Sequence, residues 1–411
     1  MIAFLERIQE RFFNRFWNPF IVLVFAGVFA AFYFGLTGTL WAVTGEFTRW
    51  GGNFLQLFGV DTSKWAYFNA IKLKGEPINR TDGWLVMGML LGGLFSALIS
   101  QNFKWKVPRQ KRRWVWGFVG GALAGFGTRL AMGCNLAAFF TGVPQFSLHA
   151  WFFIAGTALG TYIGVKLAVL PIFKGKPKVE FGIRPAKVSS STIQPNRRQL
   201  YAAAVVFGVL VLIAIYYISS GQPMLGLAAL FGAVFGMLIQ RGQICFTSGL
   251  RDLWLTGRGT MAKAIIIGMA IQTVGTAIFI YKGAQPVIHW ASLGSLLGGV
   301  MFGVGIVIAG GCETGWMYRL MEGQVQFIAV GIGNIVGATI LAYGWDHWGI
   351  FNVLVKGAPE VNLITSLGWS GALFVTGALL VILYLLVVWK ENSYTKKIAR
   401  RSTPASKKTT A

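Results

Sequence analysis

The sequence predicts an all-α polytopic membrane protein with about 9–10 transmembrane helices and short re-entrant helices between them. Two features of the composition support this fold class: 55% of the 411 residues are hydrophobic and only 12% are charged. A third feature is glycine, with 54 residues, many of them three or four positions apart within apolar stretches, as in closely packed membrane helices. These observations exclude a soluble enzyme, a disordered chain and a secreted module held together by disulfides.

The positive charge of the chain is concentrated in short segments between the apolar stretches. The formal net charge is +24, and 23 of the 37 Lys and Arg residues lie in four segments. The four segments are Arg7–Arg15, Lys104–Arg113, Lys174–Arg198 and Lys390–Lys408. Because Lys and Arg accumulate in cytoplasmic loops, these segments and both termini are expected in the cytoplasm. Membrane lipid is the partner that this pattern implies; nucleic acid is not, because apolar runs interrupt the basic surface.

The first half of the chain, residues 19–173, contains four apolar segments of near-spanning length. An amphipathic cytoplasmic N-terminus, residues 1–18, precedes it, and no cleavable signal peptide is evident. Residues 37–82 mix charges of both signs with recurring aromatic residues, which predicts short helices at the outer interface; an ordinary extracellular loop explains the pattern equally well. The expected spans are residues 19–36, 84–100, 115–132 and 148–173.

A basic segment with Pro and Ser, residues 174–199, divides the chain as a cytoplasmic linker. The second half, residues 200–389, holds six apolar segments, and a basic cytoplasmic tail, residues 390–411, follows it. Several segments are shorter than the roughly 17 residues that cross a bilayer, so some are expected to be half-spans. The six segments are residues 200–219, 226–239, 262–281, 293–309, 327–343 and 367–389.

Two Gly-Cys elements indicate an internal repeat. When Gly133-Cys134 is placed on Gly311-Cys312, the glycine pair at 120–121 falls on the pair at 298–299. Counting spans from the basic segments, the chain reaches the first element on the outer side and the second on the cytoplasmic side. The repeat is therefore predicted to be inverted, and inverted repeats place substrate sites near the midplane, at interrupted helices.

The three cysteines of the chain all lie beside glycine where an apolar segment ends. Cys134, Cys245 and Cys312 occur in the contexts MGCN, RGQICF and GGCE. A disulfide would leave one thiol over, and a zinc or iron–sulfur site is not predicted because there is no CxxC pair and the three histidines are scattered. No metal and no cofactor is therefore expected. Neutral thiols are weak, polarisable hydrogen-bonding groups, which suit a soft anion with a terminal sulfur or selenium.

Small and polar residues next to the thiols are candidates for binding the rest of such an anion. Gly133, Gly242 and Gly311 permit loops whose N–H groups point inward. Half-helices that follow such loops attract negative charge at their N-termini. Asn135, which directly follows the first cysteine, is assigned to the same supporting group.

Three charged side chains accompany the thiols in apolar surroundings, where charge is costly and usually functional. Arg129, five residues before the first cysteine, is expected to attract the anion. Arg241, four residues before the second, either has the same role or anchors the chain at the membrane interface. Glu313, beside the third, either pairs with an arginine or relays a proton.

At these motifs the chain resembles the YeeE/YedE family of bacterial inner-membrane proteins, and its YedE branch in particular. The segments FGTRLAMGCNLAAFFTG, RGQICFTSGLRD and GIVIAGGCETGWMYR carry the resemblance, which extends over nearly the whole chain. It implies a thiosulfate uptake protein of hourglass shape, in which the ion passes along Cys134, Cys245 and Cys312 by S–H···S hydrogen bonds. It also implies a multi-pass location in the bacterial inner membrane and a small TusA-like sulfur-carrier protein as a cytoplasmic partner.

Four functions remain open on these observations, one of which, a structural or assembly membrane protein, leaves the Gly-Cys breaks and the intramembrane arginine unexplained. The first is uptake of thiosulfate or a related soft sulfur oxyanion. The second, uptake of a selenium compound such as selenite, follows from the link of YedE-type proteins with selenium metabolism. The third is a membrane sulfurtransferase with persulfide chemistry, for which Arg241 near Cys245 is the support. We expect a transporter rather than an enzyme, and direct ATP drive is not expected because no GxxxxGK[ST] motif is present.

One feature departs from the family pattern. The better-understood members carry an RGxxCF element near the start of the first half, whereas the corresponding part of this chain, Gln101–Trp105, has no cysteine. The route of the anion is therefore expected to be arranged differently in the first half.

Overall fold

The computed structural model describes residues 6–7, 9–73, 75–170 and 196–402. Every element named in this part of the chain is a helix, and nine helices within it are long and apolar enough to cross a membrane. The expected fold class, an all-α polytopic membrane protein, is therefore confirmed. Most of the basic linker, residues 174–199, and parts of both termini lie outside the described residues.

The long helices begin and end within a few residues of the expected spans. They are α2 (Pro19–Thr37), α5 (Thr81–Ile99), α6 (Arg112–Leu130), α7 (His149–Ala168), α8 (Arg197–Ser219), α9 (Pro223–Arg241), α11 (Thr260–Tyr281), α12 (Leu293–Ala309), α14 (Gln326–His347) and α16 (Leu363–Ser402). Helix α6 has the length of a span but carries three arginines. Helix α16 has a non-helical residue at Gly368, with φ 72°, and then continues beyond the expected span into the basic tail.

Short helices fill the breaks between the long ones. They are η1 (Gln9–Phe13), α3 (Thr44–Leu57), η2 (Thr62–Lys64), α4 (Ala66–Ala70), η3 (Pro77–Asn79), η4 (Asn135–Phe140), η5 (Val143–Gln145), α10 (Phe246–Leu255), α13 (Glu313–Met321) and α15 (Ile350–Leu354). Three of them, η4, α10 and α13, directly follow the three cysteines and position the candidate site.

Glycine faces bring the long helices into backbone contact in parallel pairs. A Cβ atom at Gly88 or Gly92 of α5 would collide with the carbonyl oxygen of Ala229 or Ala233 of α9. Contacts of the same kind join α6 to α14, α7 to α12 and α2 to α11. Small residues thus permit the close approach that holds membrane helices together without a hydrophobic driving force.

Helices α6 and α12 cross at the centre of the bundle in opposite directions. Gly120 lies against Ala309, and Gly127 lies against Gly298. Residue numbers therefore increase along α6 in the direction in which they decrease along α12, so the two helices are antiparallel. The Gly-Cys elements that follow these two helices are therefore approached from opposite ends of the molecule. This is the arrangement that an inverted repeat requires, although the repeat itself stays a prediction.

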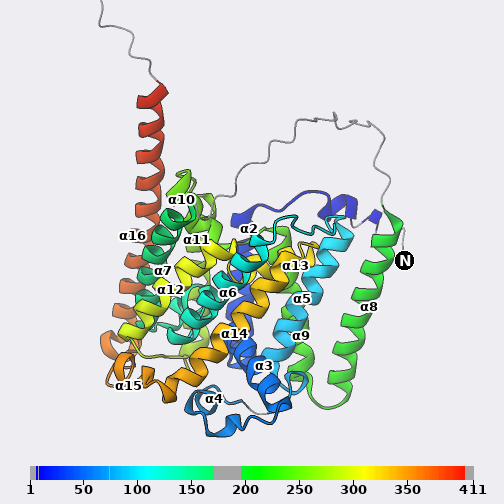
Figure 1. Ribbon diagram of the computed structural model, residues 1–411, viewed down its shortest axis with the longest axis horizontal. Helices are drawn as coiled ribbons and strands as arrows, with labels where there is room; N and C mark the ends of the chain where they lie inside the picture. Colours follow the sequence, from blue (N-terminus) through cyan, green and yellow to red (C-terminus); the bar gives the residue numbers. More distant parts are fainter. Residues whose placement is uncertain (1–5, 8, 74, 171–195, 403–411) are drawn as a thin grey trace, which may run out of the picture.

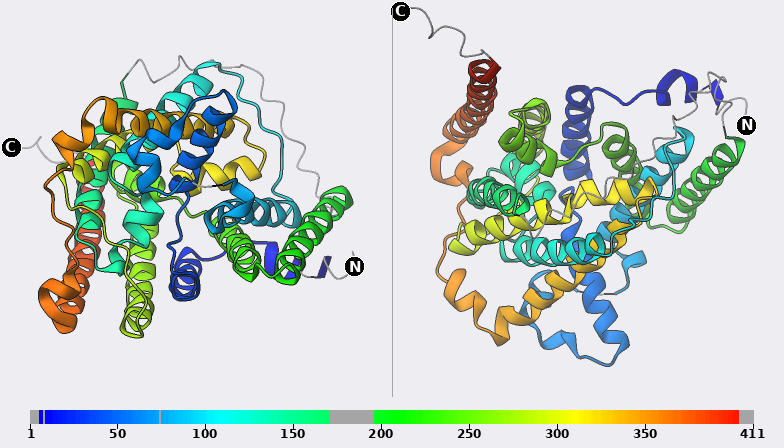
Figure 2. Two further views of the ribbon diagram at one scale, coloured as in Figure 1. Left: turned by 90° about the horizontal axis from the view of Figure 1, so that it is seen from below. Right: turned by 45° about the horizontal axis from the view of Figure 1, so that its top comes forward.

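Different segments close the two ends of the bundle (Figure 1). At the first, which we call the basic end, the loop 100–111 pairs with the turn 322–325; the Lys106 N–H donates to the carbonyl of Gly323 (2.8 Å). At the other end, α3, α4 and η3 cover the helix termini, and we call residues 44–82 the cap (Figure 1). Helices α8 and α16 stand on opposite sides of the bundle (Figures 1 and 2) and are the least buried spans, at 22% each, so their exposed apolar faces suit contact with lipid.

A buried ion-pair network holds the cap together. The carboxylate of Glu46, with 0% of its side chain exposed, accepts from Arg80 Nη2 (2.6 Å) and Arg49 Nη1 (3.2 Å). Arg49 Nη1 also donates to Asp82 at the start of α5 (2.7 Å). Burial raises the pKa of Glu46, and the two arginines act in the opposite direction. The segment expected at the outer interface is therefore fixed to a transmembrane helix rather than attached as a loose loop.

Candidate functional site

All three cysteines occupy the same local position, immediately before a short helix. Cys134 precedes η4, Cys245 precedes α10 and Cys312 precedes α13, each with an extended backbone. Each thiol is free, and the three residues are 0%, 1% and 1% exposed. The sequence predicted this gathering of thiols at helix breaks, and the structure places every one of them at the N-terminus of a half-helix.

The three breaks share a turn that the sequence did not indicate. Two residues before each cysteine the backbone is left-handed, with φ of 55° at Met132, 49° at Gln243 and 80° at Gly310. This conformation is easy for glycine and costly for other residues. Its occurrence at Met and Gln in equivalent places shows that the surrounding fold imposes the turn, and strain of this kind is concentrated at functional sites.

Two of the thiols are in direct contact. The Sγ atoms of Cys245 and Cys312 lie 3.8 Å apart. The backbone N–H of Phe246, the first residue of α10, donates to Cys312 Sγ (3.2 Å), and Thr314 Oγ1 lies 3.3 Å from the same sulfur. A Cβ atom at Gly315 would lie 2.7 Å from Cys245 Sγ, so the absence of a side chain there makes room for the pair.

Cys134 lies toward the cap. The neighbours of its sulfur include the hydroxyl of Thr44 and the backbone N–H groups of Leu136 and Ala137 in η4. Glu313 is 1% exposed; its Oε1 accepts from Asn334 Nδ2 (3.2 Å), and its Oε2 has no partner in the protein. Of the two roles expected for Glu313, the contact seen is with an amide and not with an arginine.

Arg129 and Arg241 point in different directions although both precede a cysteine at similar spacing. Arg129, 5% exposed, donates from Nε to the Tyr67 hydroxyl (2.7 Å) and from Nη1 to Thr44 Oγ1 (3.4 Å), so it faces the cap beside Cys134. Arg241 instead faces the N-terminal segment, where its guanidinium lies 4.9 Å from the Phe16 ring centroid. The contacts of Arg241 are therefore those of the anchor that was its alternative interpretation.

Of the remaining residues expected at the site, Asn135 has unpaired polar atoms, and the three glycines pack against neighbouring backbone or side chains. Asn135 is 0% exposed, and neither its Nδ2 nor its Oδ1 has a partner in the protein. Gly311 adjoins the α13 backbone, where a Cβ atom would lie 3.2 Å from Trp316 N. Gly133 packs against η4, and Gly242 packs against Val22 of α2.

Several further buried polar atoms near the cysteines lack a partner in the protein. They include Thr247 Oγ1 on α10, Trp316 Nε1 on α13 and Asn334 Oδ1, whose amide contacts Glu313. Buried polar groups are almost always hydrogen-bonded, so these atoms are free to bond a polar molecule or water. Among the residues that the structure describes, no group of three or more His, Cys, Asp or Glu is arranged to hold a metal ion.

Arg319 lies against the candidate site and was not singled out from the sequence. It lies in the last turn of α13, and its Nη1 donates back to the carbonyl of Gly310, at the turn before Cys312. The guanidinium is an electrostatic neighbour of both Cys245 and Cys312. An arginine in a segment between two apolar runs would have been a candidate if α13 had been recognised as a half-helix rather than as part of a loop.

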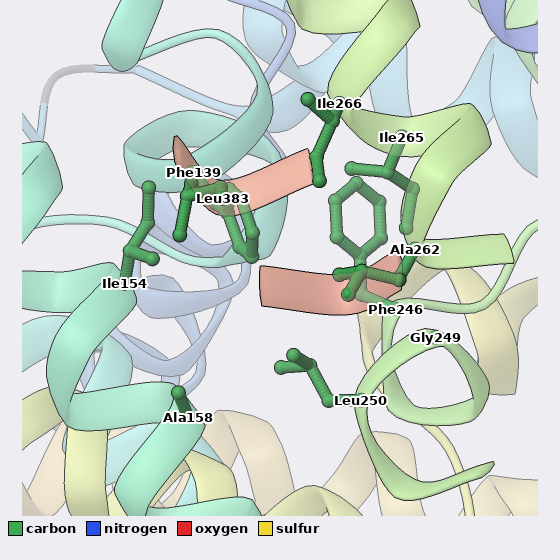
Figure 3. Close-up of a pocket in the computed structure, with 11 residues that line it drawn as sticks. Phe139, Ile154, Ala158, Phe246, Gly249, Leu250, Ala262, Ile265, Ile266 and Leu383 are labelled. Atoms are coloured by element: carbon green, nitrogen blue, oxygen red, sulfur yellow. The ribbon is translucent and has the colours of Figure 1, made fainter. Parts of the chain in front are cut away.

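An apolar cavity of about 70 Å³ flanks the site on the side of α16 (Figure 3). Phe139 of η4 and Phe246 of α10, with ring centroids 5.6 Å apart, line it together with Leu250 and Leu383. The labelled side chains face a common space without a charged group among them (Figure 3). An anion is poorly served by such a lining, so the cavity is not a candidate for anion binding.

Comparison with known proteins identifies the family. The family model described as sulphur transport matches residues 4–163 and 241–411. The chain is 47% identical over 403 residues to "Probable transporter YedE" of Escherichia coli (strain K12), covering 98% of each chain. It is 46% identical over 395 residues to the protein of the same name from Salmonella typhimurium, covering 95% of this chain and 97% of that one.

A shorter similarity links the chain to a second kind of relative. "Thiosulfate transporter TsuA" of Escherichia coli (strain K12) is 33% identical over 165 residues, which cover 39% of this chain and 46% of TsuA. No solved structure matches the chain. The names of these relatives support the expected non-enzymatic role, and the resemblance to YedE proteins is confirmed. The family match and the similarity over nearly the whole length show that this chain belongs to the sulphur transport family.

Proposed function

We propose that this protein carries thiosulfate, or a related soft sulfur oxyanion, across the bacterial inner membrane by a relay of hydrogen bonds along Cys134, Cys245 and Cys312. The observation that carries the proposal is the placement of three free, buried thiols at the N-termini of three half-helices. The name of the relative TsuA, a thiosulfate transporter, agrees with this cargo.

The chemistry of the site matches the two ends of thiosulfate. Its terminal sulfur is soft and polarisable, as are neutral thiols, which can donate and accept weak hydrogen bonds. Its oxygens are hard acceptors, which the N–H groups of the half-helices and the free amide of Asn135 can serve. Helix dipoles and thiols bind an anion weakly enough that it can be released to the next contact.

The proposed path begins at the cap and ends at the basic end. Arg129 attracts the anion beside Cys134, and the contact of Cys245 with Cys312 forms the next step. Gly133 and Gly311 shape the loops around the thiols, and Glu313 directly follows Cys312 in the chain. At the break before α10, Gly242 packs against Val22 and Arg241 anchors the chain to the N-terminal segment. We place the basic end and both termini in the cytoplasm, where a TusA-like sulfur carrier would take up the anion.

Uptake of sulfur-labelled thiosulfate into proteoliposomes tests the proposal, with selenite and sulfate as competitors. We expect saturable uptake that sulfate inhibits weakly and that Cys134→Ala, Cys245→Ala and Cys312→Ala each reduce by about tenfold or more. Ser220→Ala, at an exposed turn, is the control for reconstitution and is expected to transport normally. Normal uptake by all three cysteine variants would overturn the relay, and uptake of selenite alone would replace thiosulfate as the cargo.

A further inference from the structure

The side chain of Arg319 returns to the start of its own helix. It lies seven residues after Cys312, yet its Nη1 reaches the Gly310 carbonyl, and a Cβ atom at Gly311 would lie 3.3 Å from that nitrogen. Side chains of a helix lean toward its N-terminus, which allows a long arginine to cover this distance. The guanidinium therefore lies against the turn that presents Cys312.

The charge of Arg319 is not cancelled by a carboxylate. No ion pair of Arg319 occurs among the described residues, and its guanidinium is held instead by the rings of Tyr318 (5.4 Å) and Phe327 (5.6 Å). The nearby carboxylate of Glu322 is taken up by Gln240 (3.0 Å) and Gln243 (2.7 Å). A cation stabilised by rings and a carbonyl keeps hydrogen-bond donors for an anion, because neither partner removes its charge.

The other two arginines near the cysteines face other segments. Arg129 is bound by Tyr67 and Thr44 of the cap. Arg241 is also held by rings and a carbonyl, and its Nε and Nη1 have no partner in the protein, but it faces the N-terminal segment. Arg319, in contrast, is an electrostatic neighbour of both Cys245 and Cys312. A full positive charge therefore lies against the turn that leads into Cys312, on the α13 side that continues to the basic end.

We propose that Arg319 is a positioning residue that binds the oxygens of the anion while its sulfur lies at the Cys245–Cys312 pair. This rests on the proposed transport function. The guanidinium offers a planar fork that matches two oxygens of an oxyanion, and the thiols offer soft contacts for the sulfur. The two ends of the cargo are thereby recognised separately, so that anions lacking either the terminal sulfur or the oxygens fit less well.

The test compares Arg319→Gln, Arg319→Met and Arg319→Lys in the full-length protein, with Arg251→Gln as the matched control. Arg251 lies on α10, six residues after Cys245, and pairs with Asp252 (2.9 Å) away from the thiols. We expect Arg319→Gln and Arg319→Met to raise the KM for thiosulfate uptake by about tenfold or more, because a hydrogen bond to a charged group is lost. Arg319→Lys keeps the charge without the fork and is expected to raise KM less, and Arg251→Gln should leave it unchanged.

A second readout does not depend on transport. Thiosulfate should slow the reaction of all three cysteines with N-ethylmaleimide in purified protein. In Arg319→Gln this protection should be lost at Cys245 and Cys312 and kept at Cys134. The assignment would be overturned if folded Arg319→Gln or Arg319→Met kept the wild-type KM and the wild-type protection of Cys245 and Cys312. It would also be overturned if only the maximal rate fell while KM and this protection stayed unchanged. Failure of the wild type to take up thiosulfate would reject the proposed function itself, whereas normal uptake by Arg319→Gln would reject only the role of Arg319.

Discussion

At the scale of single residues, backbone geometry positions the thiols. A left-handed residue two positions earlier turns the chain, so that each extended cysteine sits at the entrance of the next half-helix. The N–H of Phe246 then reaches Cys312 Sγ, which brings the starts of α10 and α13 together. The contact of the two thiols follows from this meeting of helix ends, with Gly315 leaving the space for it.

Gly315→Ala is expected to separate the thiol pair and reduce thiosulfate uptake. The new methyl group would lie 2.7 Å from Cys245 Sγ and 3.6 Å from Cys312 Sγ, closer to the first sulfur than van der Waals contact permits. Alanine favours a helix over glycine by about 1 kcal/mol, so any loss reflects the displaced sulfur and not a weaker helix. Proteoliposome uptake and thermal unfolding in detergent measure the two effects.

Gly377→Ala in α16 provides the matched control, because nothing lies within 4 Å of a Cβ atom at that position. It should gain the same helix preference and transport normally. Wild-type uptake by Gly315→Ala would show that the close contact of Cys245 with Cys312 is not needed for transport.

The sequence predicted the thiols but not the orientation of the charges around them. Cysteine and glycine act through the local chain, so their pattern shows where helices break. Arg129 and Arg241 have nearly the same spacing to a cysteine, yet one faces the cap and the other the N-terminal segment. That difference depends on which distant segment packs against each break, and so does the return of Arg319 toward Gly310.

At the scale of elements, the cap reaches into the site. Thr44, at the start of α3, contacts both Arg129 and the Cys134 thiol. The ring of Phe47 lies 5.4 Å from that of Trp316 on α13. The sequence predicted short interfacial helices here, but their contact with residues far along the chain could not be read from local periodicity.

Glu46→Gln is expected to loosen the cap. The change leaves Arg49 and Arg80 without their shared buried carboxylate, and breaking a buried ion pair costs about 3–5 kcal/mol. Hydrogen–deuterium exchange should quicken in α3 and α4, and thiosulfate uptake should fall because Thr44 is no longer held beside Cys134. Asp61→Asn, whose side chain is 57% exposed in the same cap, should change neither measurement. Slow exchange in Glu46→Gln, equal to that of the wild type, would mean that packing alone holds the cap.

At the scale of the whole molecule, glycine contacts connect the helix pairs to the site. Cys134 follows α6 and Cys312 follows α12, and the two helices touch through Gly127 and Gly298. An approximate number of spans, about 9–10, and the presence of glycine faces could be predicted from the sequence, because length and spacing are local properties. The partner of each face could not, since a glycine stripe fits any other small-residue stripe equally well.

Gly127→Ala is expected to lower both the stability of the bundle and thiosulfate uptake. A Cβ atom there would lie 2.5 Å from the Gly298 carbonyl oxygen, so α6 and α12 must separate, at a cost of about 1–3 kcal/mol for overpacking. Gly208→Ala on the peripheral α8 has nothing within 4 Å of its new methyl group and should unfold at the wild-type temperature or above it. Thermal unfolding in detergent and uptake into proteoliposomes distinguish three outcomes. If the unfolding temperature and the uptake both decrease in Gly127→Ala but not in Gly208→Ala, the central crossing of α6 and α12 sets the distance between the two Gly-Cys elements. If stability decreases while uptake persists, the thiols tolerate a wider crossing, and if neither changes, α6 and α12 do not meet at Gly127.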